Sequence, residues 1–198
     1  MNLLLTAFEP FNKLSENASL DVLNAIPDTI EGLTLIKTVL PVIYDNKIYK
    51  QLLMKHHPDI VIHMGEAGNR PFVNLEYRGV NKMSATVPDN HGVTMNGQPI
   101  AVGGNEELIE TLGSKNIVDH LSSLGYPIAL SESAGSFICN LALYSSLQAV
   151  IELMMATKVG FIHLPRLSHQ VNPVGMPTIE LTLAVDTVLA VIRELIKK

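Results

Sequence analysis

Short apolar segments alternate with segments of helical period, and this alternation constrains the fold more than any other feature of the 198-residue sequence. The apolar segments are rich in Ile, Val and Leu, as strands buried on both faces of a sheet tend to be. They cover Leu3–Ala7, Leu33–Val42, Ile60–Met64, Ile128–Ser131 and Val159–Leu164. We expect these segments to be central parallel strands of one sheet.

The segments between them repeat near 3.6 residues and predict helices that cover the sheet. They are Ser19–Ala25, Asp45–Lys55, Asn116–Leu124, Cys139–Ala156 and the closing Thr178–Lys198. The predicted fold class is α/β, a three-layer α/β/α sandwich with a mostly parallel mixed central sheet. Pro71–Val87 alternates with period 2 and predicts a β-hairpin excursion. The long loop Pro88–Gly104 is expected to border the functional site.

Composition and charge narrow the class of protein. A chain of this length with 47% hydrophobic residues suits one buried core, so we expect a single domain over residues 1–198. The net charge of -5 comes from scattered acids and bases without a basic patch, which argues against a nucleic-acid partner. No apolar run reaches the roughly 18 to 20 residues that span a bilayer, so no membrane partner is expected. With one cysteine and no signal-like start, a reducing cytoplasm is the expected location.

Three residues form a candidate catalytic set. Cys139 follows the small-residue turn Ala134-Gly135-Ser136 and begins a predicted helix, where peptide dipoles favour a thiolate. His163 lies near the carboxyl end of a predicted strand, where ligands of open α/β sheets bind, and could accept the thiol proton. Glu76, in the predicted hairpin, could orient the imidazole.

Residue type alone leaves structural explanations open. An isolated cysteine is more often an inert small hydrophobic residue than a nucleophile. His163 is flanked by apolar residues and could be a core histidine bonded to a backbone carbonyl, while Glu76 could be a solvated strand residue.

Two segments resemble the signatures of a known family. SESAGSFICN resembles the cysteine signature of the pyroglutamyl-peptidase I family, the pyrrolidone-carboxylate peptidases. Its matching residues are Ser131, Ala134, Gly135, Phe137, Cys139 and Asn140. GEAGNRPFVNLEYRGVN is similar to the family's glutamate signature. Its matching residues are Gly65, Gly68, Val73, Glu76, Gly79 and Asn81.

Further motifs follow in the family's order. GFIHLP, with His163 and the later Gln170, is similar to the histidine motif, and AFEPF with Asn17 and Ser19 resembles the opening segment. The family's Pro-Asp-Asn-x-Gly element is matched by Pro88, Asp89, Asn90 and Gly92. Because the motifs run from residue 5 to 180, the resemblance spans nearly the whole chain.

The resemblance implies a cysteine exopeptidase that hydrolyses the bond after an N-terminal pyroglutamate in peptides. It implies Cys139 as nucleophile, His163 as general base and acid, and Glu76 as orienter, with a thioester acyl-enzyme and no metal or other cofactor. The implied substrate-binding residues are Phe8, Phe11, Asn17, Glu66, Val87, Phe137 and Ile138. A homotetramer is implied as well.

Several positions depart from the family pattern, and two of them change the charge near the implied site. Glu66 stands where glutamine is usual, which puts a second carboxylate near the implied pocket. When ionised it would attract a cationic group or disturb the thiolate, and when protonated it would donate as glutamine does. Thr86 stands where arginine is usual, and Arg78 is the candidate to supply the missing charge.

These departures keep two alternatives open. One is a related thiol hydrolase with altered N-terminal acyl specificity. The other is a non-catalytic homologue that keeps the fold and binds a small ligand.

Overall fold

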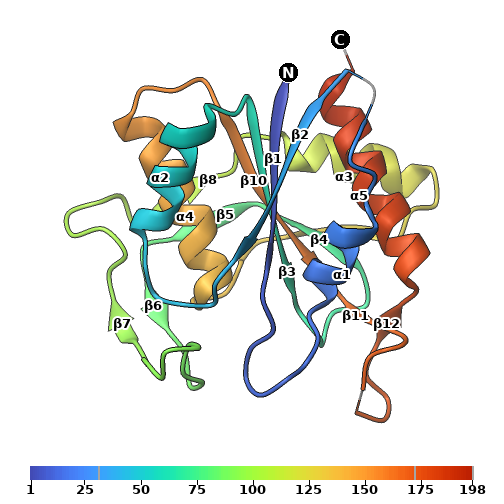
Figure 1. Cartoon of the computed structure of the whole chain (residues 1–198), viewed down its shortest axis with the longest axis horizontal. Coiled ribbons are helices and arrows are strands. Elements are labelled where there is room, and N and C mark those ends of the chain that lie inside the picture. Colours follow the sequence, from blue (N-terminus) through green and yellow to red (C-terminus); the bar gives the residue numbers. More distant parts are fainter. Residues whose placement is uncertain (31, 172, 198) are drawn as a thin grey trace.

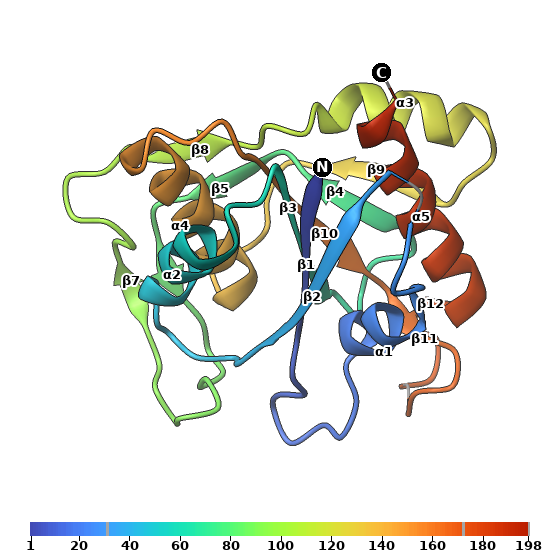
Figure 2. The ribbon, with the colours of Figure 1, turned by 45° about the horizontal axis from the view of Figure 1, so that its top comes forward.

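The computed structural model describes residues 1–30, 32–171 and 173–197. Within these residues, six strands form one sheet in the order β2-β1-β3-β10-β4-β9 (Figures 1 and 2). The strands are β1 (Asn2–Phe8), β2 (Thr34–Leu40), β3 (Ile60–Glu66), β4 (Val73–Glu76), β9 (Ile128–Ser131) and β10 (Lys158–Leu164). The predicted α/β fold with a mostly parallel mixed sheet is confirmed.

Strand direction divides the sheet into two parts. β1 pairs in parallel with β2 and β3, and β3 pairs in parallel with β10. β4 is antiparallel to β10 and parallel to β9, so β4 and β9 run against the other four strands. The prediction of five central parallel strands is therefore wrong in position for β2 and β9, which form the two edges, and wrong in direction for β9. Apolar content reports burial and does not specify the pairing partner of a strand.

Helices cover both faces of the sheet. They are α1 (Ala18–Ala25), α2 (Lys47–His56), α3 (Ser114–Ser123), α4 (Ile138–Glu152) and α5 (Leu181–Ile196). In Figure 1, α2 and α4 lie on one side of the sheet and α1, α3 and α5 on the other. α4 ends before the predicted Ala156, because Met154 has a left-handed backbone with φ of 51°. The predicted last helix reached Lys198, which lies outside the described residues. No helix in the described part of the chain is long and apolar enough to cross a bilayer.

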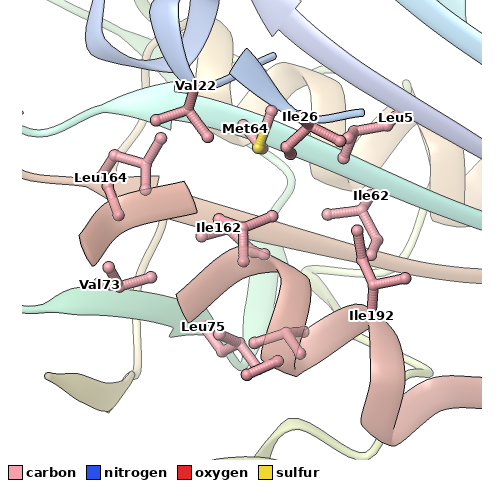
Figure 3. Packing of buried hydrophobic residues seen from close by; sticks show 14 of the residues in the cluster. Leu5, Val22, Ile26, Ile62, Met64, Val73, Leu75, Ile162, Leu164 and Ile192 are labelled. Carbon is pink, nitrogen blue, oxygen red and sulfur yellow. The ribbon is translucent and has the colours of Figure 1, made fainter. Parts of the chain in front are cut away.

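Alternation along the strands builds a separate core on each face. Ile62 and Met64 of β3, Ile162 and Leu164 of β10, and Leu75 of β4 point to the face covered by α1, α3 and α5 (Figure 3). The residues between them point to the face covered by α2 and α4. His63, Glu76, Phe161 and His163 have this intervening parity. The site therefore lies on the second face of the sheet.

A buried histidine links three elements on this second face. Nδ1 of His63 lies 2.7 Å from Oγ1 of Thr6 in β1, and its Nε2 lies 2.8 Å from Oγ of Ser146 in α4. Desolvation lowers the pKa of His63 to about 3, so the ring is neutral at neutral pH. The hydrogen bonds fix α4 against the sheet.

An extension of short strands, residues 78–109, follows β4 outside the central sheet and is called the arm below. β5 (Arg78–Val80) pairs antiparallel with β8 (Glu107–Ile109), and β6 (Met83–Ser84) pairs antiparallel with β7 (Asn96–Gln98). The excursion that the sequence predicts over Pro71–Val87 thus begins later and extends further, because β4 belongs to the central sheet. After β10, the short strands β11 (Arg166–Leu167) and β12 (Thr178–Ile179) pair with each other.

Candidate active site

A cavity of about 180 Å³ opens where the carboxyl ends of β1, β3 and β10 meet the start of α4. Parallel strands end at the same edge of a sheet, which is where ligands of open α/β folds bind. The lining residues are Phe8, Phe11, Asn17, Val42, Glu66, Ala134, Gly135, Ser136, Phe137, Ile138, Cys139 and His163. Cys139 and His163 therefore share this cavity.

Strand register brings His163 and Glu76 together. His163 is paired with Asn74 across the antiparallel β10–β4 ladder, and Glu76 lies two residues further along β4 on the same face. Nδ1 of His163 lies 2.6 Å from Oε1 of Glu76, whose side chain is fully buried. A carboxylate accepts only, so Nδ1 carries the proton and Nε2 is left as an acceptor. The predicted orienter geometry is thus present between these two side chains.

Cys139 is the second residue of α4. Among the residues that the structure describes, no side chain caps the start of this helix, whose first backbone N–H groups lack intrahelical partners. A Cβ atom added to Gly65 of β3 would come within 2.9 Å of the Cys139 sulfur and within 2.9 Å of Phe161 Cζ. Because Gly65 is the β3 partner of His163, the sulfur lies over the strand next to the histidine.

The thiol of Cys139 is not acidic. Burial raises its pKa to about 12, and the negative charge of Glu76 adds to the rise. The positive charge of Arg70 and the backbone N–H of Cys139 act in the opposite direction with smaller effect. The expectation of a stabilised thiolate at the helix start is therefore wrong, because loss of hydration outweighs the helix N-terminus.

Arg70 supplies the positive charge that pairs with Glu76, and the sequence analysis assigns it no role. Its Nη1 donates to Oε1 of Glu76 at 2.5 Å, and its Nη2 donates to the Ser133 carbonyl at 3.0 Å. Arg78, the predicted substitute for the missing arginine, instead bonds Glu107 and the Glu132 carbonyl on the surface. The signal available in the sequence was a basic residue six positions before the candidate glutamate.

Glu66 is held by three donors at the end of β3. Its Oε1 accepts from Nε of Arg166 at 3.0 Å, and its Oε2 accepts from Nε2 of Gln170 at 3.0 Å and from the Ala18 N–H at 2.9 Å. The structure thus shows Glu66 attracting a cationic group, which is one of the outcomes expected from the sequence. The partner, Arg166, had no assigned role in the sequence interpretation.

The remaining predicted pocket residues divide into walls and scaffold. Phe8, Phe11, Phe137 and Ile138 line the cavity with Val42, whereas Val87 is not among its described lining residues. Asn17 also lines it and caps α1. Its Oδ1 accepts from the Ser19 N–H and hydroxyl, and its Nδ2 donates to the Glu9 carbonyl.

Two motif residues brace the segments around the cavity. Oδ1 of Asn140 accepts from the Val80 N–H, and its Nδ2 donates to the Val80 and Lys82 carbonyls, which ties the arm to α4. Asp89 accepts from the backbone N–H groups of Tyr44, His91 and Val93. These residues are positioned to shape the loops.

Comparison with known proteins assigns the family. The family model for pyroglutamyl peptidase matches residues 1–198. The chain belongs to this family. It is 36% identical over 199 residues to the pyrrolidone-carboxylate peptidase of Thermococcus onnurineus, with 100% of both chains covered. It is 31% identical over 201 residues to the pyrrolidone-carboxylate peptidase of Thermosipho africanus, covering 100% of this chain and 98% of that one.

Solved structures of this family share the fold. The pyrrolidone carboxyl peptidase of Pyrococcus furiosus superimposes with a TM-score of 0.93 at 29% identity, covering 98% of each chain. The pyroglutamyl peptidase I of Bacillus amyloliquefaciens gives a TM-score of 0.89 at 27% identity, covering 96% of this chain and 94% of that one. The predicted family and the predicted enzyme class, a cysteine hydrolase of the pyroglutamyl-peptidase I type, are therefore confirmed. Across the described residues, no three His, Cys, Asp or Glu side chains are grouped to hold a metal ion.

Proposed function

We propose that this chain removes an N-terminal pyroglutamate from peptides, with residues 1–198 acting as one catalytic domain. The 2.6 Å contact between His163 Nδ1 and the buried Glu76, beside a cavity that Cys139 also lines, carries the proposal. It gives a nucleophile, a base and an orienter in one place. Membership of the pyroglutamyl peptidase family supports the same activity.

Acyl-enzyme formation begins with attack of the Cys139 sulfur on the carbonyl carbon of the pyroglutamyl residue. Because the thiol pKa is about 12, the thiol is neutral beforehand, and Nε2 of His163 takes its proton as the C–S bond forms. The carbonyl oxygen becomes an oxyanion, which the free N–H groups in the first turn of α4 are suited to stabilise.

Collapse of this intermediate breaks the C–N bond. The imidazolium gives its proton to the leaving amine, and the shortened peptide departs from a thioester on Cys139. Water then loses a proton to His163 and attacks the thioester, which releases pyroglutamate and returns the proton to sulfur. Glu76 keeps Nδ1 protonated throughout and stabilises each imidazolium.

Substrate selection follows from the composition of the cavity. Pyroglutamate has no charged α-amine, so the aromatic and aliphatic walls accept its ring and penalise an ammonium group by desolvation. Asn17 retains one amide N–H beyond the one bonded to Glu9, and Glu66 retains acceptor capacity on Oε1. We assign these two groups to the lactam.

Hydrolysis of a fluorogenic pyroglutamyl amide tests the proposal, with the matching prolyl amide as control because its ring carries a charged amine. We expect turnover of the first substrate alone, and a loss of at least about a thousandfold in Cys139→Ser. Equal activity of both proteins would remove Cys139 from the mechanism. Wild-type activity on another N-terminal acyl amide instead would favour the altered-specificity hydrolase, and lactam binding without any turnover would favour the non-catalytic homologue.

We extend the proposal to a cytoplasmic homotetramer on the strength of the family resemblance. The single cysteine suits a reducing compartment. Light scattering at working concentration tests the tetramer, and a monomeric mass would contradict it.

A further inference from the structure

Arg70 contacts the candidate site at two points. One nitrogen of its guanidinium donates to Oε1 of Glu76 at 2.5 Å, the same oxygen that lies 2.6 Å from His163 Nδ1. The other donates to the Ser133 carbonyl at 3.0 Å. Oε2 of Glu76 is buried and has no hydrogen-bond partner among the described residues. Arg70 and His163 are thus the two donors to this carboxylate.

The first contact compensates the charge of Glu76. The Glu76 side chain is fully buried, and burying a carboxylate is costly unless an opposite charge pairs with it. The Arg70 side chain is 26% exposed, so its own charge stays partly hydrated while it neutralises the buried partner. Without this cation, Glu76 would be buried with His163 as its remaining donor among the described residues.

The second contact reaches the segment that carries the nucleophile. Ser133 lies between β9 and α4, in the turn that leads to Cys139. The guanidinium is planar, so fixing one nitrogen on Glu76 also fixes the direction in which the other meets the Ser133 carbonyl. Arg70 therefore spans from the end of β4 to the turn before α4.

We propose that Arg70 is a positioning residue of this site. One nitrogen of its guanidinium holds Glu76 against His163, and the other holds the turn that leads to Cys139. The inference rests on the proposed function, since the groups it positions are those of the proposed triad.

The sign of the expected pH effect follows from the charges around the Cys139 thiol. Burial and the negative charge of Glu76 raise the pKa of this thiol, and the positive charge of Arg70 lowers it. His163 and Glu66 line the same cavity, and Glu66 is paired with Arg166. Removing the positive charge of Arg70 therefore raises the thiol pKa further, and the thiolate appears at higher pH.

The experiment compares Arg70→Gln and Arg70→Lys with a matched control, Arg78→Gln. Arg78 makes the same pair of contacts at the surface, 2.5 Å to the Glu107 carboxylate and 3.0 Å to the Glu132 carbonyl. For Arg70→Gln we expect kcat on the pyroglutamyl amide to fall about tenfold or more, with KM little changed. Arg70→Lys should lower kcat less, because it keeps the charge and loses only the forked pair of donors, and Arg78→Gln should match the wild type.

Alkylation of Cys139 by iodoacetamide supplies a readout that does not need turnover. Arg70 lowers the pKa of the thiol, so its loss should move the alkylation profile to higher pH. An unchanged kcat and an unchanged alkylation profile in folded Arg70→Gln would overturn the inference. If Arg70→Gln does not fold, Arg70→Lys decides by the same two measurements. A wild type without pyroglutamyl activity would refute the proposed function, and the alkylation profiles would still test Arg70.

Discussion

Glu66 and Glu76 are two carboxylates at the ends of strands near one cavity, and they are held differently. Glu66 accepts three hydrogen bonds spread over both oxygens, from Arg166, Gln170 and the backbone of Ala18. Within the described part of the chain, Glu76 accepts two bonds on one oxygen, and the other oxygen is buried without a partner. The first arrangement compensates the negative charge at both oxygens, whereas the second concentrates both donors, Arg70 and His163, on a single oxygen.

The pairing of Glu66 with Arg166 also explains how the site accommodates a glutamate where the family usually has glutamine. An uncompensated carboxylate there would add to the negative charge that already disfavours the thiolate. Arg166 lies within ion-pair distance, and both side chains are nearly buried, with exposures of 12% and 5%. The charge of Glu66 is therefore balanced locally by Arg166.

The largest expected effect comes from removing the charge of Glu76. Glu76→Gln keeps an acceptor for His163 but cannot stabilise the imidazolium, so kcat on the pyroglutamyl amide should fall about 10³- to 10⁴-fold with KM little changed. Glu107→Gln, at the exposed partner of Arg78, is the control and should retain wild-type kcat. A fall of less than tenfold in Glu76→Gln would contradict the role of orienter.

Removing the charge of Glu66 should affect stability more than the rate. Glu66→Gln leaves the nearly buried Arg166 without its anion, so the free energy of unfolding should fall by about 3 kcal/mol, as measured by urea denaturation. The double variant Glu66→Gln with Arg166→Gln should recover part of this loss, because no unpaired charge remains. A single variant as stable as the wild type would show that the pair contributes nothing.

The smallest effect concerns the reactivity of the thiol. Because burial raises the Cys139 pKa to about 12, alkylation should be slow at pH 7 and rise about tenfold per pH unit in the alkaline range. Glu76→Gln should move this profile to lower pH, since the charge of Glu76 raises the thiol pKa, while the exposed control Glu107→Gln should leave it in place. A wild-type rate that levels off near neutral pH would contradict the raised pKa.

Much of the fold could be predicted from the sequence because alternating apolar and amphipathic segments report burial directly. The directions of β4 and β9 could not be predicted, because their partners are distant in the chain and the sequence of a short strand does not specify which strand it pairs with. The arm after β4 was placed too early for the same reason, since Val73 and Leu75 alternate equally well in a sheet and in a hairpin.

Site residues that stand in recognisable motifs could be predicted from the sequence, whereas ion pairs that form only in the tertiary structure could not. Cys139, His163 and Glu76 stand in motifs, but Arg70 and Arg166 acquire their partners only when separate strands and loops come together. The acidity of the thiol was misjudged because position at a helix start can be read from the sequence, whereas the loss of water around the sulfur depends on tertiary packing.

Gly65 has a consequence for how this enzyme can vary. The sulfur of Cys139 rests against a strand position where even one methyl group would come within 2.9 Å of it and of Phe161. The nucleophilic sulfur thus packs directly against the backbone of β3, and alanine at position 65 would displace the sulfur or Phe161. Reactivity therefore constrains a residue that has no side chain.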